Sequence, residues 1–150
     1  MKALAPNILF LMPDQLRWDF VGAYGSAFAN TPNIDRLAAM GTVFERCYSP
    51  SPVCIPARAS ILTGQNSLAT GVLNNNYWLR PDHEACGVPS FATLLGAAGY
   101  HTEAIGKMHF IPWDLSEGFA HRLIAEDKRH IHIRDDYQAY LRSHGFAKSR

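Results

Sequence analysis

Four stretches of the chain carry the hydrophobic patterns of β-strands. Residues 7–12 form a continuous apolar run, which is typical of a central strand in a parallel sheet. We predict a second buried strand over residues 100–105. Apolar and polar positions alternate over residues 42–48 and again toward the end of residues 122–133, and this period of two predicts two further strands.

Four other segments carry the start and stop signals of helices. Proline suits the first helical position, where its missing N–H costs nothing, and glycine suits the position just after a helix ends. On these signals we expect helices over residues 31–41, 56–62, 89–98 and 135–143. Thr31 is expected to cap the first helix, and Pro56 is expected to open the second. Strands that alternate with helices predict an α/β layered fold.

Composition and charge exclude several classes of protein. The 150 residues are 47% hydrophobic and 18% charged, which fits one globular domain with a core of its own. The formal net charge of +1 gives no basic surface for nucleic acid. The first apolar run is too short for a signal peptide or a membrane span, so we expect a cytoplasmic protein that binds no membrane.

The three cysteines are an odd number without the Cys-x-x-Cys spacing of a zinc site, which argues against a disulfide framework and a structural zinc. Cys54 begins a Cys-x-Pro-x-Arg block. We expect Cys54 to lie just before a helix N-terminus, where unpaired N–H groups and the helix dipole favour negative charge. Arg58, four residues later, could present a cation to whatever Cys54 binds or becomes.

Polar residues that follow two of the predicted strands are further candidates. Asp14 follows the first strand and could bind a metal ion, or it could simply cap a turn. Lys107 and His109 follow the strand at 100–105. Two positions apart in an extended segment, they would point the same way, where they could hold an anion and protonate a leaving group. Each could equally be a surface lysine or a hydrogen-bonded histidine. Asn75 lies in a predicted loop and could donate to anionic oxygens or merely form a turn.

His130 and His132 alternate with isoleucines inside the predicted strand at 122–133. Their side chains would share one wet face, and a metal site built from the pair is a weaker alternative to the sites above.

Four ordered motifs together resemble the N-terminal part of type I sulfatases, which belong to the alkaline phosphatase-like superfamily. The motifs are Pro6-Asn7-Ile8-Leu9-Phe10 with Asp14-Gln15, Thr31 to Ala38, Cys54-x-Pro56-x-Arg58 with Leu62-Thr63-Gly64, and Gly106-Lys107-Met108-His109. The Asp-Gln-Leu and Gly-Lys-Met-His-Phe stretches are similar in sequence to those of choline-sulfatase-like members. The resemblance implies a three-layer α/β sandwich with a mostly parallel central sheet, of which residues 1–150 are the N-terminal portion.

The resemblance also implies roles for the matched residues. Cys54 would be oxidised to formylglycine by a formylglycine-generating enzyme, and its hydrated aldehyde would attack the sulfur of a sulfate monoester. Asp14 and the modified Cys54 would bind a divalent cation, Ca²⁺ first, with Mg²⁺ or Mn²⁺ as alternatives. Arg58 would stabilise the nucleophile, and Lys107 and His109 would hold sulfate and assist the leaving group.

The same resemblance implies that Asn75 contacts the sulfate and that Gln15, where many members have a second acid, ligates the metal or orients the nucleophile. Ile55 stands where the family usually has a small residue. The substrate would be a sulfated small molecule or sugar, and assembly into a homo-oligomer stays open. Family members are several times longer and carry further ligands downstream, so we expect residues 1–150 alone to be inactive.

Two other readings stay open beside this one. A phosphonate or phosphodiester hydrolase of the same superfamily shares the cysteine motif but tends to lack the Lys-x-His pair. A non-catalytic remnant would keep Cys54 as a structural thiol. A cysteine hydrolase that pairs Cys54 with His109 has no orienting motif to support it.

Overall fold

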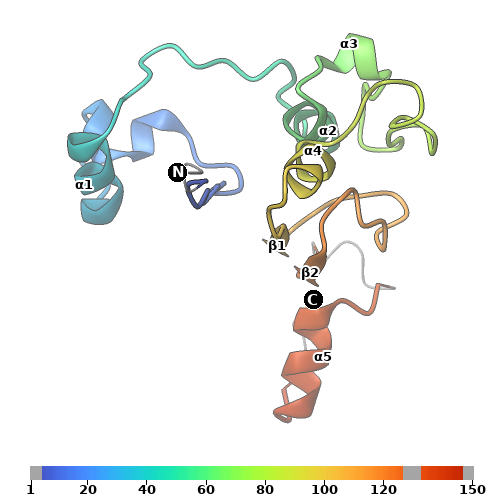
Figure 1. The fold of residues 1–150 in the computed structure, drawn as a ribbon. Coiled ribbons are helices and arrows are strands. Elements are labelled where there is room, and N and C mark those ends of the chain that lie inside the picture. The colour runs from blue at the N-terminus through green and yellow to red at the C-terminus, as the bar shows by residue number, and fades with distance from the viewer. Residues whose placement is uncertain (1–4, 127–132, 147–150) are drawn as a thin grey trace. The chain divides into compact units, whose positions relative to one another are not determined.

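The computed structural model of the protein describes residues 5–126 and 133–146. The chain divides into two compact units, residues 1–48 and residues 49–150. Each unit has its own helices (Figure 1).

The first unit is built around one helix. Two short 3₁₀ helices, Trp18–Phe20 (η1) and Gly22–Tyr24 (η2), precede α1, Pro32–Met40. The predicted helix at 31–41 is confirmed, but Thr31 does not cap it through its side chain. Instead Thr31 Oγ1 accepts from the Gly22 N–H (2.8 Å) and donates to Asp35 Oδ1 (2.9 Å), so the hydroxyl ties η2 to the helix.

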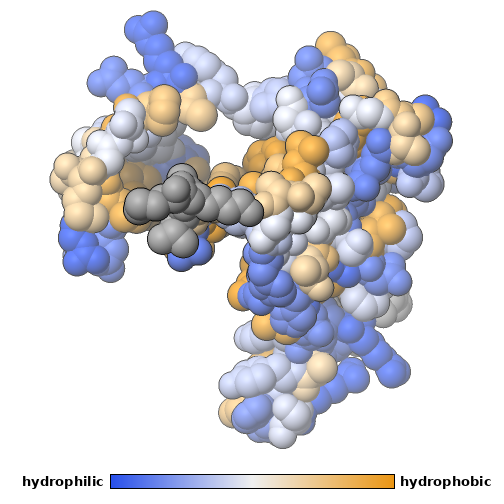
Figure 2. Space-filling view, viewed as in Figure 1, coloured by the Kyte–Doolittle hydropathy of each residue, from blue (hydrophilic) through white to orange (hydrophobic). Residues whose placement is uncertain are grey.

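The strands predicted at 7–12 and 42–48 are wrong for this structure. Within residues 5–48, the described part of the first unit, the chain forms no strand, and Leu9 is 81% exposed. A strand exists only through hydrogen bonds to a neighbouring strand, and residues 5–48 supply none. Apolar side chains therefore remain at the surface of the molecule (Figure 2).

The second unit is α/β. It contains α2 (Cys54–Thr63), α3 (Ser67–Thr70), α4 (Phe91–Ala97), β1 (Glu103–Gly106), β2 (His121–Ile124) and α5 (Asp136–Ser143). The two strands pair in parallel (Figure 1), with Glu103 opposite His121 and Gly106 opposite Ile124. Parallel pairing is the arrangement that the sequence predicts, although residues 107–120, which connect β1 to β2, form no helix.

The strand predictions in this unit are confirmed in part. The strand expected at 100–105 occupies residues 103–106, and a strand from His121 to Ile124 overlaps the start of the one expected at 122–133. The alternation that predicted this second strand lies over residues 130–133, of which 130–132 are outside the described residues. His130 and His132 lie outside the described residues.

Helix α2 sits on the core of the second unit. Ile55, Ala59 and Leu62 point from one side of α2 into the core. The other buried members come from the loops and from β2: Val72, Leu79, Met108, Phe110 and Ile124. Each such side chain gains on the order of 1.5–3 kcal/mol by leaving water, so the core fixes the helix that carries Cys54.

The start of α2 differs from the prediction. Cys54 is the first helical residue rather than the residue before the helix, and Pro56 is the third rather than the first. The first bond into the helix runs from the Ala57 N–H to the Val53 carbonyl. Because the N–H groups before Ala57 have no partner inside the helix, proline costs nothing at the third position either. The end is as predicted, with Gly64 at φ 68° donating to the Ser60 carbonyl.

Candidate active site

Cys54 lies at the N-terminus of α2, half-buried and with a free thiol. The first-turn N–H groups and the helix dipole surround it with positive potential. One of these N–H groups, that of Ile55, donates to the side-chain Oδ1 of Asn75 at 2.9 Å. The amide that the sequence offered as a sulfate ligand therefore also caps the helix that carries Cys54.

Arg58 joins α2 to the segment that follows β1. Its Nη1 donates to the main-chain carbonyl of Lys107 at 2.5 Å, across 49 residues of sequence. This hydrogen bond joins the helix that carries Cys54 and Arg58 to the Lys107–His109 segment, which the sequence placed at a strand end.

The prediction that the Lys107–His109 segment is extended is wrong. His109 has φ 59°, in the left-handed region, so the two-residue alternation that would point Lys107 and His109 the same way does not apply. His109 is 4% exposed, and its Nε2 lies 3.9 Å from Glu126 Oε2. The histidine is buried beside a carboxylate rather than open to solvent.

Glu126 is the main residue of this region that the sequence did not single out. Its Oε1 accepts from the backbone N–H groups of Met108 (3.1 Å) and His109 (2.8 Å). Those two bonds hold the chain out of strand geometry just after β1, which is the physical reason for the wrong prediction. In the sequence Glu126 falls inside the strand predicted over residues 122–133, so no signal singled it out.

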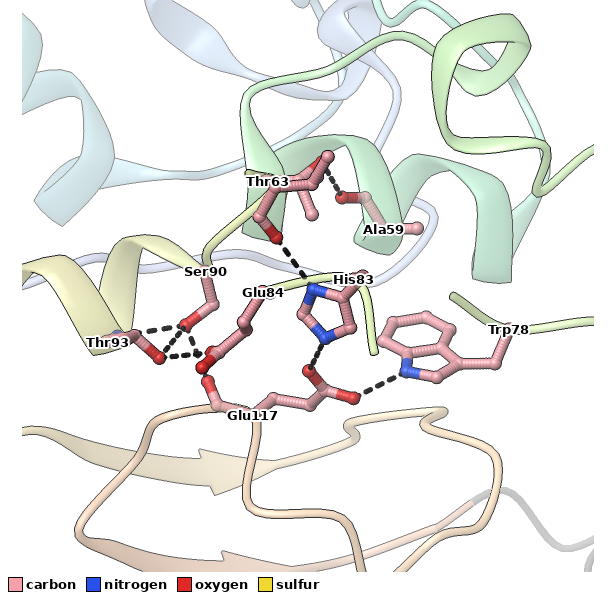
Figure 3. Close-up of polar contacts among 9 residues, drawn as sticks. Ala59, Thr63, Trp78, His83, Glu84, Ser90, Thr93 and Glu117 are labelled. Atoms are coloured by element: carbon pink, nitrogen blue, oxygen red, sulfur yellow. Dashed lines mark hydrogen bonds and ion pairs between the residues drawn. The ribbon is translucent and has the colours of Figure 1, made fainter. Parts of the chain in front are cut away.

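A buried polar cluster holds the loop that carries Asn75. Glu117 accepts from Trp78 Nε1 with Oε1 (2.6 Å) and meets His83 Nε2 with Oε2 (3.0 Å), as Figure 3 shows. His83 Nδ1 lies 2.7 Å from the Val88 carbonyl, which can only accept, so Nδ1 carries a proton. The contact between His83 and Glu117 then requires one more proton on one of these two side chains.

On the same loop Arg80 forms a bidentate pair with Asp82, with contacts of 2.6 and 2.9 Å. The hydrogen bonds from the guanidinium hold the pKa of the Asp82 carboxyl below its ordinary value. This pair is exposed to solvent and lies outside the group that surrounds Cys54.

Asp14 and Gln15 belong to the first unit, where they form an exposed turn with Gln15 at φ 56°. Their meeting with Cys54 stays a prediction. Among residues 5–126 and 133–146, no group of three His, Cys, Asp or Glu side chains is placed to hold a metal ion. In the same part of the chain, no helix is long and apolar enough to cross a membrane.

Comparison with known proteins gives one consistent result. The sulfatase family model matches residues 6–148. The chain is 39% identical over 124 residues to an arylsulfatase of Clostridium perfringens, covering 83% of this chain and 25% of that protein. It is 37% identical over 121 residues to a choline-sulfatase of Rhizobium meliloti, covering 81% and 23%. It is 38% identical over 112 residues to human N-acetylgalactosamine-6-sulfatase, covering 69% and 22%.

A solved structure agrees with the sequence relatives. A crystal structure of a candidate sulfatase from Bacteroides thetaiotaomicron matches with a TM-score of 0.58 and 30% identity, covering 70% of this chain and 22% of that one. This match and the parallel pairing of β1 with β2 confirm the α/β class of an alkaline phosphatase-like fold, present in part. The chain spans 22% to 25% of the length of these relatives.

Proposed function

Because this chain belongs to the sulfatase family, we propose that it forms the N-terminal part of a catalytic domain whose full-length enzyme hydrolyses sulfate monoesters. The observation that carries the proposal is the hydrogen bond from Arg58 to the Lys107 carbonyl. It supports a single site in which the nucleophile's helix and an anion-binding segment meet, as sulfate transfer requires.

Cys54 is the proposed nucleophile after its conversion to formylglycine. As formylglycine it supplies a hydrated aldehyde, of which one hydroxyl attacks sulfur and the other later expels sulfate as the aldehyde reforms. The position of Cys54 at the start of α2 supports this role, since helix N–H groups stabilise negative charge there. Conversion requires a formylglycine-generating enzyme as partner.

The remaining side chains of the second unit take the charge and proton roles. Arg58 stabilises the developing oxyanion near its own helix turn, and Lys107 binds the sulfate oxygens. His109 delivers a proton to the oxygen of the leaving alcohol. Because the His109 side chain is only 3% exposed, its burial excludes bulk water from that proton.

Asp14 and Gln15 are proposed to bind a divalent cation. Their carboxylate and amide oxygens at one turn are the donors that Ca²⁺ prefers, and Mg²⁺ or Mn²⁺ accept them too. A bound cation would supply charge stabilisation for the nucleophile's oxygen. Two adjacent residues are too few for a full coordination shell, so further ligands must come from elsewhere in the enzyme.

The experiment is turnover of 4-nitrophenyl sulfate by full-length protein, with bis(4-nitrophenyl) phosphate and a phosphonate monoester beside it. We expect the sulfate to be the best substrate and Cys54→Ala to abolish its hydrolysis. Cys86→Ala, which removes an exposed cysteine outside the site, is the matched control and should keep wild-type activity. Preference for the phosphorus esters, or activity in Cys54→Ala, would overturn the proposal.

A further inference from the structure

We propose that Glu126 is the positioning residue that places His109 for proton delivery. This inference rests on the proposed function for its kinetic meaning, but the placement of Glu126 is a matter of geometry. Glu126 follows β2 and His109 follows β1, so two neighbouring parallel strands bring their carboxyl ends together. That edge of the sheet is where such folds collect functional groups.

The first part of the argument is the backbone of the segment that carries His109. One carboxylate oxygen of Glu126 accepts both the Met108 and His109 N–H groups, at 3.1 and 2.8 Å. His109 is held at φ 59°, a conformation that a non-glycine residue adopts only at some cost in energy. Two charge-assisted hydrogen bonds to one buried carboxylate can offset that cost and hold His109 in the left-handed conformation.

The second part is the imidazole. Glu126 Oε2 lies 3.9 Å from His109 Nε2, and both side chains are almost completely buried, at 1% and 3% exposed. At that distance the carboxylate acts directly on the imidazole, because little water lies between two such buried groups to screen it. One residue thereby holds the backbone from which the ring projects and also lies beside the ring itself.

The third part is how Glu126 itself is fixed. Its backbone N–H donates to Asp135 Oδ2 at 2.7 Å, while Asp135 Oδ1 accepts from the Gln138 N–H as the cap of α5. Asp135 is fully buried. Glu126 is therefore anchored on a helix start before it reaches toward His109, and a small displacement of Glu126 moves His109 with it.

The carboxylate of Asp136 allows an experiment to distinguish a positioning role of Glu126 from a role in stabilising the fold. Asp136 Oδ2 accepts from the Ile124 N–H at 2.7 Å. Ile124 ends β2 two residues before Glu126, and Asp136 belongs to the same helix start that anchors Glu126. That bond holds β2 against α5, whereas the Glu126 bonds reach the segment that follows β1. Asp136→Ala is thus the matched control for Glu126→Ala.

The experiment compares Glu126→Ala, Glu126→Gln and Asp136→Ala in full-length protein. It measures kcat and KM for 4-nitrophenyl sulfate, the thermal midpoint, and hydrogen exchange of the Met108 and His109 amides. We expect Glu126→Ala to lower kcat by about 100-fold with little change in KM, because misplacement of a reacting group costs about that much. Exchange of the two amides should accelerate at least about 10-fold.

Glu126→Gln keeps an oxygen for both N–H groups, so it should keep amide protection and lose less kcat than Glu126→Ala. Asp136→Ala should lower the thermal midpoint with kcat near wild type. If Glu126→Ala does not fold, the inference is tested by the kcat and the amide protection of Glu126→Gln. Unchanged amide protection in Glu126→Ala, or equal kcat in Glu126→Ala and Asp136→Ala, would overturn the inference. If wild-type protein turns over no sulfate ester, the proposed function falls, whereas the amide exchange still tests the placement of Glu126.

Discussion

The side chain of Asn75 caps the helix on which Cys54 lies, its Oδ1 accepting from the Ile55 N–H at 2.9 Å. Asn75 and Ile55 are 20 positions apart, so the start of α2 is held by a loop rather than by its own preceding residue. Anything that orders this loop also orders the first turn around Cys54.

Asn75→Ala should therefore destabilise the protein. The Ile55 N–H loses its acceptor, and loss of a helix cap costs about 1 kcal/mol in the free energy of unfolding. Urea unfolding followed by circular dichroism measures the change. Asn76→Ala is the matched control. The hydrogen bond between Asn76 and Asn74 uses the backbone N–H of Asn76, so the substitution leaves its donor in place. Equal midpoints for the two variants would contradict the cap.

Glu117→Ala should be more damaging than any of the exposed acids. It leaves the half-buried Trp78 indole N–H and the buried His83 ring without their common carboxylate, and breaking the buried contact to His83 costs about 3 kcal/mol. Glu103→Ala, which removes an exposed carboxylate beside His101, should cost under about 1 kcal/mol in the same unfolding assay. A loss no greater than that of Glu103→Ala would show that the cluster contributes little to stability.

Gly118 is required for space as well as for backbone conformation. At φ 83° it sits against the N-terminus of α4, where an added Cβ would lie 2.5 Å from the Thr93 backbone nitrogen and closer still to Thr93 Oγ1. Gly87 has φ 82° and open space around it. Gly87→Ala should cost about 1 kcal/mol for the left-handed backbone alone. Gly118→Ala should cost about 2 kcal/mol more in the same assay, because α4 must shift. Similar losses for the two would rule out the steric requirement.

The sequence predicts the parts of this fold that are determined locally. The helices at 32–40 and 136–143 form where proline, acidic and glycine signals place them, because such signals act within one or two turns. The stretch at 7–12 is apolar enough for a strand, yet it forms none among the described residues. A strand depends on partners distant in sequence, which an apolar pattern does not identify.

The candidate site divides in the same way. Cys54, Arg58, Lys107 and His109 could be proposed from short motifs, and the structure brings their segments together through Arg58. Glu126 could not be proposed in this way, because its side chain binds backbone N–H groups 17 and 18 residues away. Every residue type except proline has a backbone N–H, so the sequence does not identify these partners. The left-handed conformation of His109 follows from that contact and was missed with it.

The central claim is that Cys54 is the precursor of the nucleophile, and mass spectrometry of one peptide tests it. Trypsin releases residues 47–58, which hold both Cys47 and Cys54, so Cys47 serves as an internal control after thiol alkylation. In active full-length protein we expect Cys47 to be alkylated, and Cys54 to be unreactive and about 18 Da lighter than cysteine, because sulfur and two hydrogens are lost and one oxygen is gained. An alkylated, unmodified Cys54 in fully active enzyme would contradict the mechanism.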